Sequence, residues 1–230
     1  MLGIIGAMDE EVAKIKEQME DVTVMSKADM DFYKGNLGGK SVVVVRSGIG
    51  KVNAAMCTQI LVDAYQVDAV INTGIAGSLN AQIDIGDIVL STDTLEHDMD
   101  AVAFGYEVGQ IPRMDTLSFE ADTELRALAK KVCKEVNPEV AVFEGRVVSG
   151  DQFVSDKKKK EWLAETFDGY CTEMEGAAIA HAAYLNRIPF LIIRAISDKA
   201  DDSASVDYPT FEAKAIEHSV KLLLEFCKQM

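Results

Sequence analysis

The sequence predicts an α/β protein of three layers, in which helices flank a central, mixed and twisted sheet. Short β-branched runs are followed by glycine or acidic turns and then by amphipathic stretches, and this succession repeats along the chain. Several runs are apolar on both faces, which is typical of central strands covered by helices. The 230 residues contain no linker and no internal repeat, so we predict a single domain over residues 1–230.

Each element of this prediction has its own pattern. Apolar and β-branched runs predict strands over residues 2–7, 41–48, 68–77, 86–93, 142–150, 169–175 and 189–197. Apolar residues at helical spacing predict helices over residues 9–20, 50–65, 120–136, 157–166, 175–186 and 209–228. Polar alternation around Phe32 and Tyr33, which ends in two glycines, predicts a hairpin over 25–40.

Charge and cysteine usage exclude several classes of protein. The chain has 23 Lys and Arg against 38 Asp and Glu, a net charge of −15, which disfavours binding to nucleic acid or to anionic membranes. No apolar run reaches the roughly 20 residues of a membrane span, and the N-terminus lacks a signal-peptide pattern, so we predict a cytoplasmic location. The four cysteines are widely spaced, which favours reduced, buried thiols over a metal or dithiol centre.

Three short motifs resemble ligand-binding sequences without their context. Gly39-Lys40-Ser41 lacks the earlier glycine of a phosphate loop and precedes a strand instead of a helix. Gly48-Ile49-Gly50 is followed by Asn53 at the third position of a dinucleotide fingerprint, so that fingerprint is incomplete. The basic run 157–160 is interpreted as a solvated helix face.

Carboxylates follow three of the predicted strands. They are Asp9-Glu10-Glu11, Glu173-Met174-Glu175 and Asp198. Ligands of open α/β sheets bind beyond the carboxyl ends of strands, so these acids suggest acid–base chemistry at one sheet edge. The alternative for the first two groups is a favourable interaction with the N-terminus of the following helix.

Two further features favour chemistry at that edge. Arg194 lies inside the apolar run FLIIRAIS, where a charge must be paired or functional. The turn Gly74-Ile75-Ala76-Gly77 ends another central strand and allows close approach of the backbone. The long irregular segment 95–119 is predicted to be functional or to pack on a partner chain.

Together these segments resemble a known family. GIIGAMDEEV, SGIGKVNAA, NTGIAGSL, AFGYEVGQIP, VSGDQF, EMEGAAIAH and RAISDKAD occur in order from residue 3 to about residue 211. This set is similar to the bacterial methylthioadenosine/S-adenosylhomocysteine nucleosidases of the purine nucleoside phosphorylase superfamily. The resemblance implies a nucleoside phosphorylase-like fold, cleavage of the bond between adenine and a 5′-alkylthio-ribose, a homodimer, and no metal or organic cofactor.

The resemblance also implies a role for individual residues. Glu11 would activate the attacking water with Arg194 near it, Asp198 would protonate N7 of adenine, and Glu175 with Met174 would hold the ribose. The other implied contacts lie along the same motifs: Met8, Ile49 and Tyr208 for the alkylthio group; Phe153 and Val154 for the purine; Ile75, Ala76, Gly77, Glu173 and Ser197 around the substrate; and Phe104 and Pro112 from the neighbouring subunit.

The chemistry of the reaction agrees with these roles. Cleavage of an N-glycosidic bond builds positive charge on the sugar and negative charge on the base, so the site needs an anion and an acid. Glu175 and Asp198 fit these needs. Asp198 must keep its proton at neutral pH, so we expect its environment and that of Glu11 to drive the two pKa values apart.

Two departures and several rivals stay open. Ile75 stands where relatives often have serine, and Tyr208 replaces a frequent phenylalanine. Rival substrates are other adenosine-type nucleosides such as aminodeoxyfutalosine and 5′-deoxyadenosine. A purine nucleoside phosphorylase is disfavoured because Asp9, Glu10 and Glu11 would repel phosphate. A non-catalytic nucleoside-binding module is disfavoured because all the catalytic carboxylates of the motif are present.

Overall fold

The computed structural model describes residues 1–230 except for the side chain of Val206. The strands are β1 Leu2–Gly6, β2 Glu20–Lys27, β3 Met30–Leu37, β4 Lys40–Arg46, β5 Ala69–Ser78, β6 Ile88–Glu96, β7 Phe119–Glu120, β8 Val142–Ser149, β9 Gly169–Glu173 and β10 Phe190–Asp198. The helices are α1 Asp9–Lys16, α2 Lys51–Tyr65, the short 3₁₀ helix η1 Val102–Phe104, α3 Thr123–Val136, α4 Lys157–Phe167, α5 Gly176–Asn186 and α6 Ala204–Gln229. The predicted α/β class is confirmed.

All ten strands belong to one mixed sheet. Its order is β10-β6-β8-β9-β5-β1-β4-β3-β2, with β7 on β6. The strand β10 pairs in parallel with β5 as well as antiparallel with β6, so five strands form a closed ring of pairings. The strands β1, β4 and β5 run parallel to one another, and the hairpin β2–β3 forms the open edge. The sheet therefore brings the ends of β1, β5 and β10 to one place.

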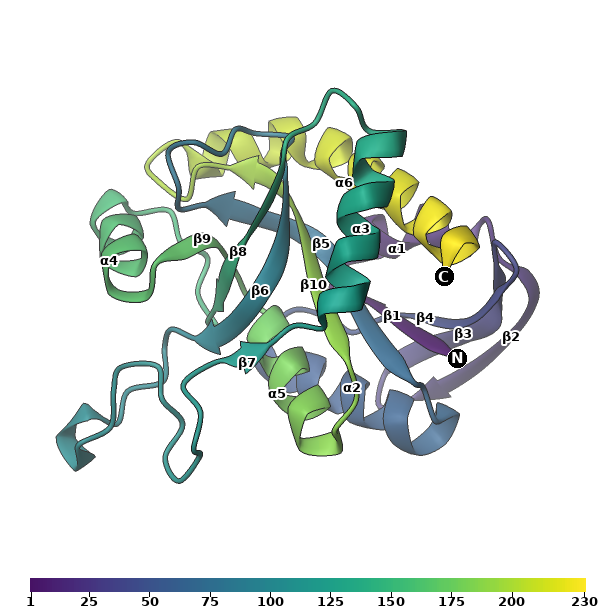
Figure 1. Cartoon of the computed structure of the whole chain (residues 1–230), viewed down its shortest axis with the longest axis horizontal. Coiled ribbons are helices and arrows are strands. Elements are labelled where there is room, and N and C mark those ends of the chain that lie inside the picture. The colour runs from purple at the N-terminus through teal and green to yellow at the C-terminus, as the bar shows by residue number, and fades with distance from the viewer.

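Helices cover the sheet in two groups (Figure 1). The helices α2 and α5 pack on each other, while α6 packs on β10, α3 and α1. Every residue of β5 and β10 is buried, which confirms the prediction that the two-sided apolar runs are central strands. Every residue of β2 is exposed, as expected for an edge strand. The four cysteines are buried and unpaired, as predicted.

Several element boundaries differ from the predictions, and the largest differences are at the end of α1, the start of the hairpin and the start of α6. The helix α1 ends at Lys16 because β2 begins at Glu20, so the hairpin starts earlier than residue 25. The predicted turn at Gly38 and Gly39, both with positive φ, joins β3 to β4. The helix α6 begins at Ala204 and includes Pro209, a residue that normally marks a helix start because it lacks an N–H.

The segment between β6 and β7 projects from the body of the molecule, at the lower left of Figure 1. It contains η1 and includes Phe104, whose side chain is 84% exposed. None of the helices in the described part of the chain is both long enough and apolar enough to cross a membrane.

Candidate active site

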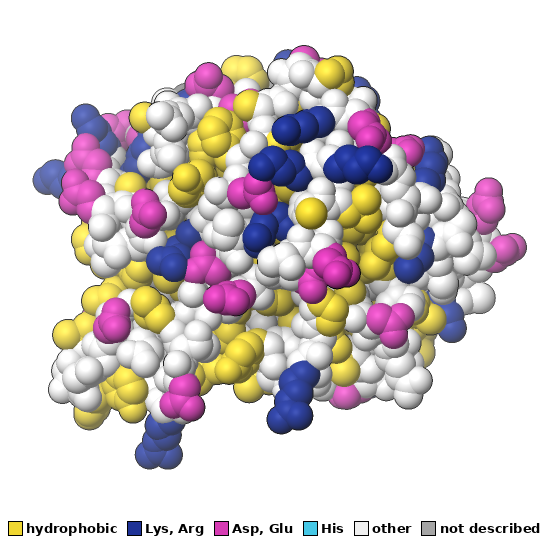
Figure 2. Space-filling view, in the orientation of Figure 1, with side chains coloured by type: hydrophobic (Ala, Val, Ile, Leu, Met, Phe, Trp, Pro, Cys, Tyr) yellow, Lys and Arg dark blue, Asp and Glu magenta, His cyan; other side chains and the backbone are white. Residues whose placement is uncertain are grey.

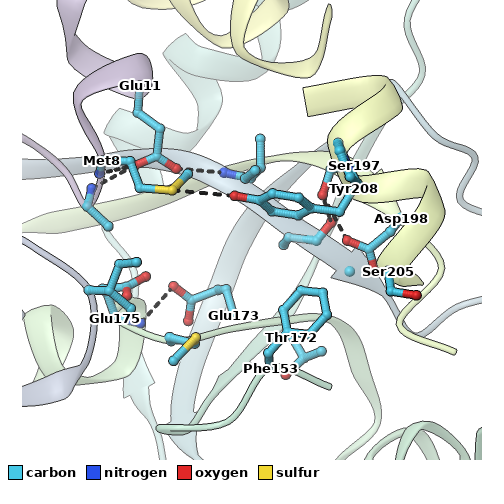
Figure 3. Close-up of a pocket in the computed structure, with 17 residues that line it drawn as sticks. Met8, Glu11, Phe153, Thr172, Glu173, Glu175, Ser197, Asp198, Ser205 and Tyr208 are labelled. Carbon is cyan, nitrogen blue, oxygen red and sulfur yellow. Dashed lines mark hydrogen bonds between the residues drawn. The ribbon is translucent and has the colours of Figure 1, made fainter. Parts of the chain in front are cut away.

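A cavity of about 520 Å³ opens where β1, β5, β9 and β10 end. Its walls also include the start of α6, and Figure 3 shows Glu11 and Asp198 at opposite ends. The lining residues are Ala7, Met8, Glu11, Ile49, Ile75, Ala76, Gly77, Phe153, Thr172, Glu173, Met174, Glu175, Ser197, Asp198, Ser205, Tyr208 and Pro209. The predicted convergence of acids at one sheet edge is therefore observed.

Glu11 is fixed at one end of the cavity by backbone donors. Its Oε2 accepts hydrogen bonds from the N–H groups of Ala7 at 2.6 Å and Met8 at 3.0 Å, and its Oε1 accepts one from Ile75 at 3.2 Å. Burial raises the pKa of Glu11, and the charge of Arg194 and the three N–H donors partly offset this effect. The carboxyl is thus oriented and poised to accept a proton.

Arg194 lies behind this end of the cavity and is 1% exposed. Its guanidinium donates to the carboxylate of Glu173 and to the side-chain oxygen of Asn72. Burial alone would raise the pKa of Glu173, but Arg194 and the hydroxyl of Ser149 hold it below its ordinary value. The positive charge of Arg194 in the apolar strand β10 is therefore paired, which is one of the two roles that the sequence predicted for it. This charge keeps Glu173 ionised.

Glu175 lies beside this pair and behaves differently. Its Oε1 accepts a hydrogen bond from the Gly50 N–H at 2.8 Å. Burial and the negative charge of Glu173 raise the pKa of Glu175 to about 8. Three carboxylates, Glu11, Glu173 and Glu175, thus share one guanidinium, and the end of the cavity that they form attracts positive charge.

The glycines of the turn after β5 leave room for these side chains. A Cβ on Gly74 would lie 2.5 Å from Oε1 of Glu11 and 3.3 Å from Nη1 of Arg194. A Cβ on Gly77 would lie 2.7 Å from Oδ1 of Asp198. The close approach that we predicted for this turn therefore serves the acids at both ends of the cavity.

Asp198 occupies the other end and is 2% exposed. Its Oδ1 accepts a hydrogen bond from the Ala200 N–H at 2.8 Å, and its Oδ2 accepts one from the Ser197 hydroxyl at 2.8 Å. Burial raises the pKa of Asp198, and the charges of Asp207 and Asp201 add to the rise. Burial raises the pKa of Glu11 as well as that of Asp198, so both shifts have the same direction, and the predicted separation of the two pKa values stays a prediction.

The aromatic wall of the cavity is Phe153, which meets the ring of Tyr208 edge-on at 5.9 Å. Lys51, the first residue of α2, connects the loop before Phe153 to the end of β6. The Lys51 N–H donates to Asp151 at 2.9 Å, and its Nζ contacts Glu96 at 2.9 Å and Asp98 at 2.7 Å.

Four predicted site residues do not line the cavity. Val154 lines a small adjoining recess beside Phe153, and Arg194 stands behind the wall. Phe104 and Pro112 lie on the projecting segment and contribute nothing to this cavity from their own chain. The sequence analysis did not single out four lining residues, although each is next or close to one that it did: Ala7, Thr172, Ser205 and Pro209.

Two interpretations of charged runs need correction. Asp9 and Glu10 are exposed and do not line the cavity, and Asp9 lies 3.3 Å from Arg46, so of the three acids Glu11 alone is a lining residue. Lys160 is not a solvated side chain, because its Nζ contacts the Lys199 carbonyl at 2.5 Å and Asp201 at 3.1 Å.

The fold and this cavity define a class. The family model described as "Phosphorylase superfamily" matches residues 1–228, and the chain belongs to that superfamily. A 5′-methylthioadenosine/S-adenosylhomocysteine nucleosidase of Staphylococcus carnosus (strain TM300) is 41% identical over an alignment of 233 positions that covers 100% of both chains. The chain is therefore a member of the 5′-methylthioadenosine/S-adenosylhomocysteine nucleosidases, which are N-glycosyl hydrolases.

Solved structures agree with this assignment. The nucleosidase of Neisseria meningitidis in complex with methylthio-immucillin-A has a TM-score of 0.96 and 39% identity, covering 100% of this chain and 99% of that one. A futalosine hydrolase mutant of Helicobacter pylori strain 26695 has a TM-score of 0.94 and 34% identity, covering 100% and 99%. Structures that share this fold thus include a nucleosidase and a futalosine hydrolase.

Proposed function

We propose that this protein hydrolyses 5′-methylthioadenosine and S-adenosylhomocysteine to adenine and the corresponding 5-thioribose. The observation that carries this proposal is the single cavity with a buried acid at each end, Glu11 held by three backbone donors and Asp198 held by two donors. Such a site can supply a proton to a leaving base and remove one from water during the same reaction.

Asp198 acts as the acid in this mechanism. Its raised pKa keeps the proton on the carboxyl, which donates it to N7 of adenine as the C1′–N9 bond breaks. The electron pair of that bond moves to the purine, so protonation stabilises the leaving group. Phe153 stacks on the purine, and the backbone of Phe153 and Val154 contacts its edge.

Glu11 acts as the base on the opposite side of the sugar. Water adds to C1′ and its proton passes to Glu11, whose orientation is set by the Ala7, Met8 and Ile75 N–H groups. The carboxylate of Glu173, which stays ionised, stabilises positive charge on the ribose, and Glu175 with Met174 binds its hydroxyls. Release of the proton from Glu11 and reprotonation of Asp198 complete the cycle.

We also propose that the protein is a homodimer. The face formed by α2 and α5 has a groove lined by Val52, Ala55, Met56, Ala182 and Leu185 among others, and Val52 is 70% exposed. Hydrophobic side chains also gather on the projecting segment at the lower left of Figure 2, where Phe104 is 84% exposed. Packing of these surfaces between two copies would bury them and bring Phe104 and Pro112 to the neighbouring cavity.

Light scattering on the purified protein tests this arrangement and is expected to give twice the mass of one chain. Phe104→Ala should raise KM for methylthioadenosine several-fold with a smaller change in kcat. An unchanged KM would remove Phe104 from the site.

The cytoplasmic location stays a prediction.

The second candidate activity is hydrolysis of aminodeoxyfutalosine or 5′-deoxyadenosine. The similarity to the Helicobacter pylori futalosine hydrolase supports it, because that protein shares 34% of the sequence and the whole fold. A phosphorylase reaction is opposed by Glu11, Glu173 and Glu175, which leave the water end of the cavity with an excess of carboxylates over cations.

The decisive assay is adenine release from methylthioadenosine, followed by chromatography, with and without added phosphate. We expect adenine and methylthioribose at the same rate in both conditions. A requirement for phosphate, with methylthioribose 1-phosphate as product, would overturn the hydrolase proposal. Absence of adenine together with turnover of aminodeoxyfutalosine would replace the proposed substrate.

A further inference from the structure

Tyr208 and Glu212 form a polar pair at the roof of the cavity. The Tyr208 ring lies across the cavity with its hydroxyl toward Met8 and Glu11 (Figure 3). The hydroxyl oxygen lies 3.1 Å from Oε1 of Glu212, one turn further along α6, and 3.4 Å from Sδ of Met8. A phenol has one proton, and a carboxylate is a far better acceptor than a thioether sulfur, so the proton of Tyr208 goes to Glu212.

This hydrogen bond leaves the Tyr208 oxygen with lone pairs and no proton to offer. Burial raises the pKa of Tyr208, and the charges of Glu212, Glu11 and Glu10 raise it further, so the phenol stays neutral. The charged groups that act most strongly on this hydroxyl are therefore all carboxylates. A ligand group that arrives there meets an acceptor in a region of negative potential.

The described residues beside the Tyr208 hydroxyl in the same chain are apolar or already hydrogen-bonded. Met8, Ile49 and Pro209 line this end of the cavity with apolar atoms, and the Met8 N–H is already taken by Glu11. A carboxylate placed beside Tyr208 would lose its water without gaining a donor and would be repelled by Glu212, so S-adenosylhomocysteine, which carries both groups, would present its ammonium to this pair. An ammonium or hydroxyl could instead donate to the Tyr208 oxygen or to Glu212.

We propose that Tyr208 and Glu212 are specificity-determining residues that make the 5′ end of the pocket favour substituents ending in a cation or hydrogen-bond donor over substituents ending in a carboxylate. This inference rests on the proposed function and on the family resemblance, which implies that Met8, Ile49 and Tyr208 contact the alkylthio group. It applies to substrate choice and leaves the roles of Glu11 and Asp198 unchanged.

Three thioether nucleosides of matched size test the proposal: 5′-S-(2-aminoethyl)-, 5′-S-propyl- and 5′-S-(carboxymethyl)-thioadenosine. We would measure kcat/KM for adenine release from each at pH 7.5 and low ionic strength, with methylthioadenosine as the reference substrate. The wild-type protein is expected to prefer the amine to the carboxylate by at least about tenfold. Glu212 attracts a cation and repels an anion a few ångströms away, and at a partly buried site the difference between these two interaction energies is of that order.

Glu212→Gln is expected to reduce the amine-to-carboxylate ratio by about fivefold or more, and Tyr208→Phe should reduce the amine-to-propyl ratio because the acceptor is lost. Glu225→Gln makes the same charge change on the same helix, thirteen residues and about 20 Å away, and should leave both ratios unchanged. Thermal melts of each variant check that it is folded.

The outcomes separate this inference from the proposed function. Equal ratios in the wild type and in both variants, or a wild-type preference for the carboxylate, would overturn the inference while turnover of methylthioadenosine leaves the function standing. No adenine from methylthioadenosine, with turnover of the carboxylate-bearing aminodeoxyfutalosine, would overturn both. A shift of the ratio only in Tyr208→Phe would remove Glu212 from the proposal.

Discussion

The two ends of the cavity hold equally buried acids in different electrostatic surroundings. At the Glu11 end, three carboxylates share Arg194, and the backbone N–H groups of Ala7, directly after β1, and of Ile75, in β5, orient Glu11. At the Asp198 end, Ser197 and Ala200 are the only hydrogen-bond donors to a single acid within the described side chains, and the nearest charges that act on it are further carboxylates. In the proposed mechanism, paired charge at one end and unpaired burial at the other distinguish the base from the acid among chemically similar groups.

The largest effect is expected at the acid end. Asp198→Asn cannot supply a proton to the leaving base, so kcat for adenine release should fall by about 10³–10⁴-fold while KM changes by a few-fold. Steady-state assays with methylthioadenosine measure both constants. Asp202→Asn, at an exposed position close by in sequence, is the matched control. A loss of kcat below tenfold would show that the two ends do not divide the acid and base roles in this way.

The base end should be the more sensitive to loss of its cation. Arg194→Met leaves Glu173 buried without its partner and should cost about 3–5 kcal/mol of stability, or roughly 6–20 °C in Tm for a domain of this size. The double variant Arg194→Met with Glu173→Gln should recover part of that loss. Scanning calorimetry measures both. Equal stability of the single variant and the wild type would mean that charge pairing does not hold this end together.

A smaller loss of rate is expected at the base. Glu11→Gln removes the proton acceptor but keeps much of the geometry, so kcat should fall by about 10²-fold. Asp9→Asn, on the same helix turn but exposed, is the control and should keep its activity. If Glu11→Gln turned over at the wild-type rate, another group would activate the water, and the comparison of the two ends would have to be redrawn.

The smallest effect is a pH dependence of stability. Because the pKa of Glu175 is raised to about 8 from an ordinary value of 4.5, the folded protein keeps a proton that the unfolded chain releases over this range. This contribution to stability is complete below about pH 4.5 and is lost as the pH rises through 8.

The Glu175→Gln variant lacks this titration, so we expect its Tm to rise relative to wild type from pH 5 to pH 8. Thermal melts at pH 5, 6.5 and 8 measure the difference, and Glu165→Gln, an exposed glutamate on α4, is the control. A difference in Tm that is the same at all three pH values would contradict the raised pKa and with it the contrast between Glu173 and Glu175.

Much of the fold could be predicted because its signals are local. The two-sided apolar runs identified β5 and β10, and the acids after β1, β9 and β10 identified one sheet edge. The closed ring of pairings could not be predicted, since the contact of β10 with both β5 and β6 depends on neighbours far apart in sequence. The start of α6 was missed because Pro209 marks a helix start in isolation, whereas here it lies within the helix.

The site shows the same division. The family resemblance pointed to Glu11, Asp198 and Glu175. The single arginine in an apolar strand, Arg194, indicated a buried charge that had to be paired, and its partner is Glu173. Of the carboxylates that act on Asp198, Asp201 lies three residues further along the chain, whereas Asp207 lies in α6, which packs on β10. The common direction of the Glu11 and Asp198 pKa values also depends on burial, which motif spacing does not report.

The closed ring also has a consequence for how the chain acquires activity. The strand β10 is the last to leave the ribosome, yet it lies between β5 and β6, which are made much earlier. Until it arrives, those two edges stay unpaired, Glu173 has no guanidinium, and the acid at position 198 does not yet exist in the nascent chain. Recovery of catalysis during synthesis or refolding therefore reports closure of the entire sheet and not the formation of any one part of it.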